Sequence, residues 1–488
     1  MISWGISANS HDAALAVFKN KELLFASHSE RFSGVKNDPH LDKNLINYAL
    51  HYGEPNEVHW YENPIKKSLR QLYAGQGWNF ADNNIRKYLD RYGVDCPINY
   101  TSHHRSHAAA GYYTSGYDNA TVLCIDAIGE FETLTIWEAE GNDMYQVWSQ
   151  KFPHSIGLWY SAMTQRIGLK PNEDEYILMG MAAYGDKGRL YHDILDQFID
   201  VNYNNKNLTV RLKQNLHRGC KSWRPDLTTE QDMYDIAAAT QLIYEQALLE
   251  MLLYCKYTCK SKNLVLMGGC ALNCSANGQA KELFDNVWIM PNPSDAGSAI
   301  GAVLSNYNEH IEFKSPYLGY DIKGKYPVEN TLNALLSSGI CGVANGRAEY
   351  GPRALGNRSL FADPRGEHTK DRVNDIKHRQ KFRPFAPVVL EEHAQELFDG
   401  PMGPYMQYTA KCRDTNKYPA IAHIDGTSRV QVVNKKLHTG LYELLRRWYS
   451  ATGCPMLLNT SLNIKGKPMV NDKVDAKEFA LKYGVSVY

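Results

Sequence analysis

Ala120-Thr121-Val122-Leu123-Cys124-Ile125-Asp126 is the stretch that decides the fold. Its run of apolar and β-branched residues predicts a buried strand, and the acidic Asp126 stands at the end of that strand. A turn at Gly129 leads to a second predicted strand, 133–138, and the turn at 141–143 leads to a third, 144–148. Together these residues predict a three-stranded meander.

The same pattern occurs at the start of the chain. Predicted strands cover residues 2–7, 14–18 and 22–27, and the turn Asn9-Ser10-His11-Asp12 separates the first two. A pattern that occurs twice indicates an internal repeat. We therefore expect an α/β fold with a duplicated actin-like ATPase core, whose ligands lie between its halves. The alternative is a pair of unrelated α/β lobes.

Helices are expected at 42–52, at 83–92 and from Thr228 onward, where Gln231 completes a capping box. Residues 263–267 form a further buried strand, followed by Gly268-Gly269 and then by Asn273. Strand, paired glycines and helix start can bring backbone N–H groups close to a phosphate. Many α/β turns share this pattern, so it is a weak signal alone.

His103 and His107 are four residues apart, so a helix places them on one face. Asp126 could add a carboxylate, and Asp295, in the loop before a helix of small residues, could be a fourth ligand. Imidazole and carboxylate ligands suit iron, zinc or manganese. The alternatives are a polar helix start with hydrogen-bonding histidines, and N-capping by Asp295.

Composition narrows the class of protein. Lys plus Arg, 53, equals Asp plus Glu, 53, so no global basic field favours nucleic acid. No apolar run is long enough for a bilayer, and no signal peptide is evident, so we expect a cytoplasmic protein with reduced cysteines. The pairs Cys255/Cys259 and Cys270/Cys274 imitate a zinc site, an alternative that their places in a helix and a loop disfavour.

The last third of the chain is basic. After a linker expected at 314–326, residues 342–390 carry ten Lys and Arg against five Asp and Glu. Arginine forks bind phosphate oxygens, and lysine adds a point charge. A solvated basic face would carry Lys and Glu at helical spacing instead. We therefore expect a phosphate- or nucleotide-binding pocket here.

Several motifs, taken in order, resemble the NodU/CmcH-type O-carbamoyltransferases. Besides the histidines and Asp126, they are Gly268-Gly269-Cys270-Ala271-Leu272-Asn273, Gly351-Pro352-Arg353-Ala354-Leu355-Gly356, Phe382-Arg383-Pro384-Phe385-Ala386-Pro387 and Asn459-Thr460-Ser461. The resemblance covers nearly the whole chain. It implies an actin-like, TsaD-like carbamoyl-transfer domain at 1–318 and an α+β, YrdC-like domain at 319–488 that forms carbamoyl-adenylate from carbamoyl phosphate and ATP.

The resemblance also implies roles for individual residues. His103, His107, Asp126 and Asp295 match the positions that bind a ferrous or similar divalent ion. The adenylate and carbamoyl phosphate positions match Lys377, Arg383, Arg429, Asn459 and Ser461, assisted by Arg353, while Gly268, Gly269 and Asn273 would contact the adenylate during transfer. In the first turn, His11, with Asp12 beside it, is the candidate general base for the acceptor hydroxyl, or else positions the substrate.

The expected cofactors are a divalent metal, Fe²⁺ above all, and ATP with Mg²⁺, with carbamoyl phosphate as co-substrate. The expected partner is a hydroxyl-bearing acceptor. A nucleotide or nucleic acid is a possible acceptor, although the neutral net charge does not indicate one. A homodimer is also possible. No membrane partner is expected. The alternatives are threonylcarbamoyl transfer to tRNA and a non-catalytic, nucleotide-binding scaffold.

Overall fold

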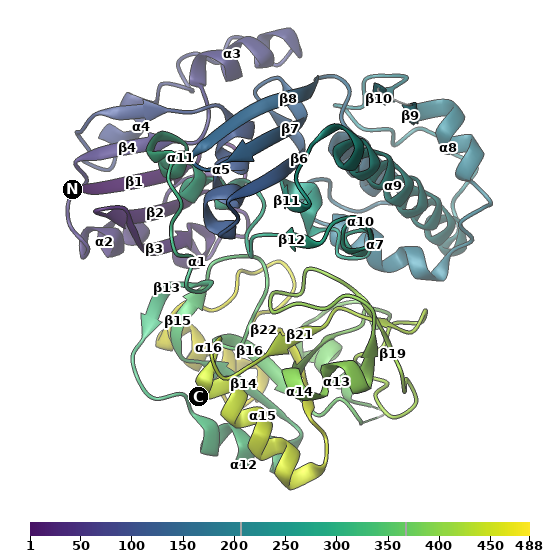
Figure 1. Ribbon diagram of the computed structural model, residues 1–488. Helices are drawn as coiled ribbons and strands as arrows, with labels where there is room; N and C mark the ends of the chain where they lie inside the picture. Colours follow the sequence, from purple (N-terminus) through teal and green to yellow (C-terminus); the bar gives the residue numbers. More distant parts are fainter. Residues whose placement is uncertain (205–206, 367) are drawn as a thin grey trace. The chain divides into compact units, whose positions relative to one another are not determined.

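The computed structural model describes residues 1–204, 207–366 and 368–488, which divide into two compact units (Figure 1). The first unit holds Met1–Leu24 and Pro39–Phe313, and the second holds Phe25–Asp38 and Lys314–Tyr488. A short N-terminal segment therefore belongs to the unit built mainly from the C-terminal third. The domain boundary between residues 318 and 319 stays a prediction.

The first unit is built from two five-stranded sheets and the helices around them. Its strands are β1 (Ile2–Ser7), β2 (Ala14–Lys19), β3 (Glu22–His28, which continues into the second unit), β4 (Glu57–Trp60), β5 (Ile98–Tyr100), β6 (Asn119–Gly129), β7 (Glu132–Glu140), β8 (Asp143–Lys151), β9 (Ile199–Asn204), β10 (Asn207–Leu212), β11 (Asn263–Met267) and β12 (Asn286–Trp288). Its helices are α2 (Lys43–Leu50), α3 (Pro64–Tyr73), α4 (Ile85–Asp90), α5 (His103–Ser115), α6 (Ile156–Arg166), α7 (Glu175–Met181), η1 (Ala182–Tyr184), α8 (Tyr191–Phe198), α9 (Glu230–Thr258), η2 (Gly269–Leu272), α10 (Gly278–Leu283), η3 (Asp295–Gly297) and α11 (Ser298–Tyr307).

The two sheets of this unit have the same topology. One has the order β3-β2-β1-β4-β5 and the other, read from its other edge, β8-β7-β6-β11-β12. In each sheet the first strand of a meander pairs antiparallel with the next strand and parallel with a later one, as β1 does with β2 and β4, and β6 with β7 and β11. This repeat confirms the predicted duplicated actin-like core.

Helices α5 and α11 pack against each other, and each also covers one sheet: α5 contacts β6 and β11, and α11 contacts β1 and β4. The helices approach so closely that a Cβ at Gly301 would lie 1.8 Å from the carbonyl oxygen of Ser106. Only glycine allows this approach, so the small residues of α11 have a packing role. The contact brings the start of α5 next to the start of α11.

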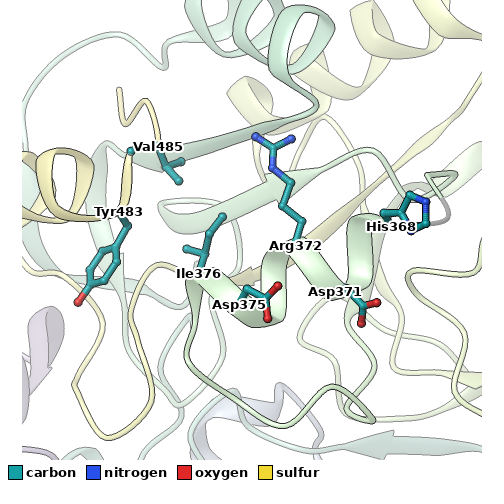
Figure 2. Close-up of a pocket in the computed structure, with 8 residues that line it drawn as sticks. His368, Asp371, Arg372, Asp375, Ile376, Tyr483 and Val485 are labelled. Atoms are coloured by element: carbon teal, nitrogen blue, oxygen red, sulfur yellow. The ribbon is translucent and has the colours of Figure 1, made fainter.

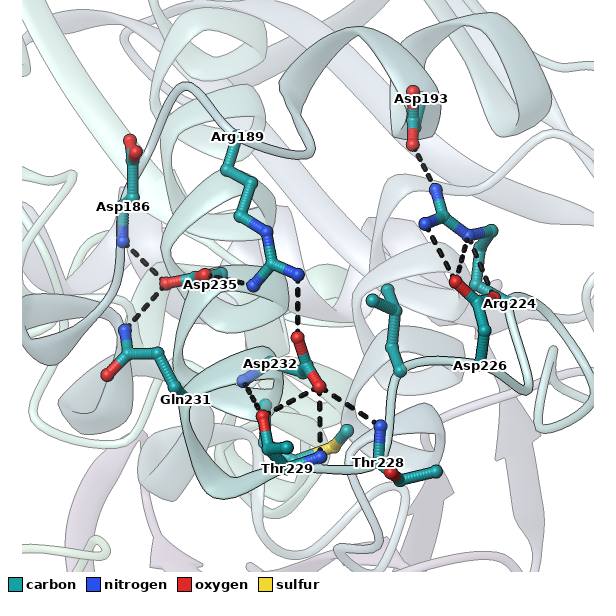
Figure 3. Close-up of polar contacts among 12 residues, drawn as sticks. Asp186, Arg189, Asp193, Arg224, Asp226, Thr228, Thr229, Gln231, Asp232 and Asp235 are labelled. Atoms are coloured by element: carbon teal, nitrogen blue, oxygen red, sulfur yellow. Dashed lines mark hydrogen bonds and ion pairs between the residues drawn. The ribbon is translucent and has the colours of Figure 1, made fainter.

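Helix α9 begins one residue later than the sequence indicated. Its N-cap is Thr229, which forms a capping box with Asp232, so the predicted pairing of Thr228 with Gln231 was wrong. Asp232 takes the capping position instead of Gln231 because its carboxylate also accepts from the backbone N–H of Thr228 and pairs with Arg189 at 2.7 Å. Figure 3 shows these contacts. Arg189 also contacts Asp235 at 2.5 Å, which fixes the loop before α8 to the start of α9.

The second unit is an α+β structure around one five-stranded sheet, β14-β16-β22-β17-β21. Its strands are β13 (Tyr317–Ile322), β14 (Ile340–Ala344), β15 (Gly346–Glu349), β16 (Arg358–Ala362), β17 (Ala386–Leu390), β18 (Phe398–Asp399), β19 (Ala410–Cys412), β20 (Thr427–Ser428), β21 (Gln431–Val433) and β22 (Met456–Ser461). Its helices are α1 (Glu30–Ser33), α12 (Val328–Ser338), α13 (Thr369–Ile376), α14 (Glu391–Leu397), α15 (Thr439–Thr452) and α16 (Lys473–Tyr483).

Two predictions about secondary structure need correction. The supposed linker 314–326 contains β13, which pairs antiparallel with β15. Its Gly, Pro and Lys residues have low strand propensity, so the sequence did not predict β13, which is stabilised by pairing with a strand later in the chain. Helix α3 was missed altogether, because its apolar residues do not face the protein core. All ten cysteines are free, and no helix in the described part of the chain is both long and apolar enough to cross a bilayer.

Candidate functional site

Four side chains with metal-ligand chemistry converge in the first unit. The Nε2 atoms of His103 and His107 lie 3.1 Å apart, and the Nε2 atom of His107 lies 3.3 Å from Asp295 Oδ1. Asp126 Oδ2 lies 3.3 Å from His103 Nε2. One ligand atom from each residue falls within 4.8 Å of the other three. The structure therefore brings together all four of the predicted metal ligands.

Different elements position these ligands. Both histidines stand in the first turns of α5, Asp126 lies on β6, and Asp295 lies in η3, just before α11. The packing of α5 on β6 and on α11 is what joins them. Secondary contacts then orient the ligands: Ser298 Oγ lies 3.1 Å from His107 Nδ1, and the Gly269 N–H donates to Asp126 Oδ1 at 3.1 Å.

The electrostatics favour a cation at this point. Burial alone would lower the pKa of His103, but Asp295 and Asp126 raise it well above its ordinary value. Burial likewise opposes ionisation of the two carboxylates, yet the histidines hold the pKa of Asp295 well below its usual range and lower that of Asp126. Two imidazoles and two carboxylates, all largely buried, suit a divalent ion.

Neighbouring groups with the same chemistry do not join this cluster. His104 Nδ1 lies 2.9 Å from Thr135 Oγ1, and burial lowers the pKa of His104 to about 3, so it is a neutral hydrogen-bonding residue. The N-cap position of α11 is Gly297, and the Asp295 carboxylate faces the histidines instead. Across the residues that the structure describes, the cysteine pairs form no such group.

The Gly268-Gly269 loop is held tightly above Asp126. Gly268 has φ +89°, and a Cβ there would lie 2.2 Å from the carbonyl oxygen of Ile125, so the position requires glycine. Asn273 lies at the end of the loop, where its amide exchanges two hydrogen bonds with Gln241, at 3.0 and 3.1 Å. The loop thus orients a metal-ligand candidate directly, a role that its sequence did not reveal.

The turn that carries His11 and Asp12 lies between β1 and β2. Nε2 of His11 is buried and has no hydrogen-bond partner among the described residues, and Asp12 adopts a left-handed backbone with φ +54°. An unsatisfied buried imidazole nitrogen is costly unless a ligand completes it. This geometry is compatible with a base or a substrate-positioning group, and both roles stay predictions.

Sequence reasoning missed a set of buried charges next to these loops. Lys67 contacts Glu62 at 2.6 Å and donates to the backbone oxygen of Asn9, in the His11 turn. Arg70 donates to the backbone oxygen of Glu130, four residues after Asp126. The basic residues among the apolar ones of α3 were the only local sign of these contacts. The backbone oxygens of Asn9 and Glu130 lie far away in the sequence.

In the second unit, Lys377 and Ser461 lie together. Lys377 is the C-cap of α13, and its Nζ atom donates to the backbone oxygen of Ser461 at 2.5 Å and to Asn463 Oδ1 at 2.9 Å. Burial, together with Arg379 and Arg383, lowers the pKa of Lys377 well below its ordinary value. The charge of Arg383 thus acts on Lys377, and the role of Arg383 at the phosphates stays a prediction.

Asn459, on β22, links two further predicted segments. Its Nδ2 atom donates to Gln431 Oε1 at 2.7 Å and to the backbone oxygen of Ala354, which directly follows Arg353, at 3.0 Å. Its Oδ1 atom is buried without a hydrogen-bond partner in the described structure, as is Nε of Arg429, two residues before Gln431. These unsatisfied atoms are the ones that a bound phosphate or carbamoyl group could complete.

Arg358 lies just after the Gly351-Pro352-Arg353-Ala354-Leu355-Gly356 motif and has a structural role. It is fully buried, and its guanidinium donates to the backbone oxygens of Asn471, Tyr320, Asn345, Gly346 and Asn357. Glu349 Oε1 accepts from the N–H groups of Leu355, Asn357 and Arg358, so a carboxylate already fills the backbone nest of this loop. The fork of Arg358 is therefore committed to holding the loop that carries Arg353.

A cavity of about 440 Å³ opens on another side of α13 (Figure 2). Its walls come from α13 and from the end of α16, and they do not include Lys377, Arg383, Asn459 or Ser461. The lining residues are His368, Asp371, Arg372, Asp375, Ile376, Tyr483, Gly484 and Val485. This cavity is separate from the converging basic and amide groups.

Both parts of the chain are similar to known proteins. Residues 66–304 match a family model described as the carbamoyltransferase N-terminus, and residues 332–488 match the carbamoyltransferase C-terminus. The uncharacterized protein sll1178 of Synechocystis is 33% identical over 97% of this chain and 93% of its own. The nodulation protein NolNO of Sinorhizobium fredii is 30% identical, covering 96% of this chain and 76% of its own.

A third relative is named for its activity. The 3'-hydroxymethylcephem-O-carbamoyltransferase of Amycolatopsis lactamdurans is 26% identical to this chain over 98% of it and 96% of that protein. The two family models together cover most of the chain, and the name of this relative agrees with their description. The chain therefore belongs to the carbamoyltransferase family and is a carbamoyl-transferring enzyme.

Proposed function

We propose that this enzyme is an ATP-dependent O-carbamoyltransferase that works through carbamoyl-adenylate. The observation that carries the proposal is the presence of two separate ligand-directed groups in one chain. One is the quartet of imidazoles and carboxylates in the first unit, and the other is the Lys377 and Asn459 cluster in the second. The YrdC-like assignment of the second unit rests on the sequence resemblance.

In the first step, carbamoyl phosphate and ATP give carbamoyl-adenylate. One water enters, phosphate leaves the carbamoyl group, and pyrophosphate leaves ATP, so the atoms balance. Arg383 holds the negative oxygens of the reacting phosphates. Lys377 fixes the Ser461 segment, while Asn459 and Ser461 hydrogen-bond the carbamoyl group. Arg429 and Arg353 bind the remaining phosphate oxygens. Mg²⁺ accompanies ATP in this scheme.

In the second step, the acceptor oxygen attacks the carbamoyl carbon, and the bond from that carbon to the adenylate oxygen breaks, so AMP leaves. His11, with Asp12 beside it, takes the proton of the acceptor hydroxyl or positions the acceptor. The Gly268-Gly269 loop and Asn273 contact the adenylate during this transfer. A ferrous or similar divalent ion would be held by His103, His107, Asp126 and Asp295 and would supply Lewis acidity for the transfer.

The decisive experiment uses the purified enzyme with carbamoyl phosphate, ATP, Mg²⁺ and Fe²⁺. Release of pyrophosphate that depends on carbamoyl phosphate supports the first step. Mass spectrometry of hydroxyl-bearing candidates, 5-hydroxymethylpyrimidine nucleotides among them, then identifies the acceptor by its added carbamoyl group. No pyrophosphate with any divalent metal, with or without acceptors, refutes the proposal. We place the reaction in the cytoplasm, where ATP is available.

A further inference from the structure

The two histidines of the quartet are held in different ways. His107 directs Nε2 toward the other ligands, and its Nδ1 lies 3.1 Å from Ser298 Oγ. A metal-binding histidine almost always makes a second hydrogen bond of this kind, which fixes the orientation of its ring. Nδ1 of His103, in contrast, is buried and has no hydrogen-bond partner among the described residues. A different kind of contact therefore has to orient the His103 ring.

Gly129, the last residue of β6, packs directly against this ring. A Cβ at Gly129 would lie 2.1 Å from Cδ2 of His103 and 2.3 Å from Cγ. Both distances are far shorter than any contact between real atoms, and the three nearest atoms all belong to the His103 ring. Only glycine therefore allows the backbone to approach the imidazole this closely.

Tyr61 makes the second contact with the His103 ring. It directly follows β4, it is fully buried, and the centroids of the two rings lie 5.3 Å apart at an interplanar angle of 55°. Rings at this separation attract each other beyond the burial of their surfaces. Packing by Tyr61 and Gly129 thus takes the place of the missing hydrogen bond.

Glu130 ties these two contacts together. The N–H of Asn63, two residues after Tyr61, donates to Glu130 Oε1 at 2.5 Å, and Nε of Arg70 donates to the backbone oxygen of Glu130 at 3.1 Å. Glu130 is buried and has a left-handed backbone with φ +53°, a conformation that persists only where the surroundings enforce it. The end of β4 and the turn after β6 are therefore joined beside His103.

We propose that Tyr61, Gly129 and Glu130 form a clamp that positions His103 and so sets the metal affinity of the quartet. A ring that is already held in place loses less freedom when the metal binds. The clamp also explains why α3 directs Arg70 inward, because Arg70 holds Glu130. This inference rests on the proposed function, to which it adds three positioning residues outside the four ligands.

The experiment titrates the whole enzyme, stripped of metal, with Co²⁺ alone. The visible absorption of bound Co²⁺ reports the geometry of its ligands, so the measurement needs no catalytic turnover. In Gly129→Ala the new Cβ displaces the imidazole, and Co²⁺ affinity should fall by about tenfold or more, with a changed spectrum. His103→Ala, which lacks the ligand itself, is the reference for complete loss of this imidazole.

A double variant shows whether the effect of Gly129→Ala acts through the ring. In Gly129→Ala/His103→Ala the Cβ has no imidazole to displace, so this protein should bind Co²⁺ as His103→Ala does. The matched control is Gly188→Ala, where a new Cβ would meet no atom closer than 3.5 Å. It should bind Co²⁺ with the affinity and spectrum of the wild type.

Two further substitutions test the other parts of the clamp. Tyr61→Phe keeps the ring and should stay within about twofold of the wild-type affinity, whereas Tyr61→Leu should bind Co²⁺ about fivefold more weakly because the ring contact is lost. Glu130→Ala removes the acceptor for the Asn63 N–H and should also weaken binding. Urea unfolding verifies that each variant is folded, and the Tyr61 pair decides the question if Gly129→Ala folds poorly.

Three results would overturn the clamp. The first is wild-type Co²⁺ affinity in Gly129→Ala, and the second is a further loss of affinity when Gly129→Ala is added to His103→Ala. The third is equal weakening by Tyr61→Phe and Tyr61→Leu, which would assign the effect to the hydroxyl and not to the ring. A wild-type enzyme that binds Co²⁺ no better than His103→Ala would instead refute the metal site of the proposed function, and the clamp with it.

Discussion

At the scale of single residues, the metal quartet depends on contacts outside the four ligands. Ser298 Oγ lies beside His107 Nδ1, and the N–H of Gly269 donates to Asp126, so two of the four ligands have a partner that orients them. Such outer partners set ligand geometry and tune metal affinity. The Asp295 side chain, 19% exposed, is the most accessible of the four.

The first prediction concerns metal content. His107→Ala should purify with much less iron than the wild type, because one of four ligands is lost. Ser298→Ala should weaken metal affinity by a smaller factor, about tenfold, because the imidazole loses its orienting partner. Elemental analysis after dialysis against a chelator checks both. His51→Ala, an exposed histidine on another helix cap, is the control, and equal metal loss in all three variants would contradict the assignment.

At the scale of elements, buried polar side chains hold the loops that carry the site. In the second unit, His438 caps α15: its Nδ1 accepts from the N–H of Leu441 at 3.0 Å, and its Nε2 lies 2.8 Å from Asn357 Oδ1. A neutral imidazole meets both contacts. Burial lowers the pKa of His438 to about 4, although Glu349 acts in the opposite direction.

The second prediction follows from this pKa. Between pH 6.5 and 4 the unfolded chain binds a proton at His438 that the folded unit excludes, so the free energy of unfolding falls as the pH falls. The slope from this residue is about 1.4 kcal/mol per pH unit. Urea unfolding at pH 7.5, 6.5, 5.5 and 4.5 should show it. In His438→Asn, which keeps a capping side chain, that part of the slope should vanish; an unchanged slope would contradict the prediction.

At the scale of the whole molecule, the chain divides its chemistry between two compact units. The quartet of metal-ligand candidates belongs to the first, and the basic and amide cluster to the second. The segment Phe25–Asp38 joins the second unit, where Arg31 donates to the backbone oxygen of Gly351 at 3.0 Å. The loop that carries Arg353 therefore depends on residues from both ends of the chain.

The third prediction tests this division of labour. Arg383→Ala should abolish carbamoyl-adenylate formation, because the reacting phosphates lose their main cationic partner. His107→Ala should still release pyrophosphate but should transfer little carbamoyl group to an acceptor. Pyrophosphate and carbamoylated product are measured separately for each variant. Loss of only the first step in both variants would show that the roles of the two units are wrongly divided.

The sequence by itself determined the repeated strands and the identity of the ligand types. Strands 2–7 and 263–267 occur as predicted. A short apolar run bounded by turn residues favours a buried strand. Local signals of this kind need no knowledge of distant contacts. The grouping of the quartet and of the residues around Lys377 came from the resemblance to a known family, which already contains the distant contacts of its members.

Only the tertiary structure decided what depends on distant partners. The strand β13 forms because β15 pairs with it, Arg358 is committed because five backbone oxygens surround it, and α3 faces its charges inward because Asn9 and Glu130 receive them. The orientation of a helix face and the occupancy of a guanidinium depend on backbone atoms that no local pattern specifies. For that reason the ligand types of the chain were readable from its residues, whereas the structural role of Arg358 and the inward charges of α3 became visible only in the fold.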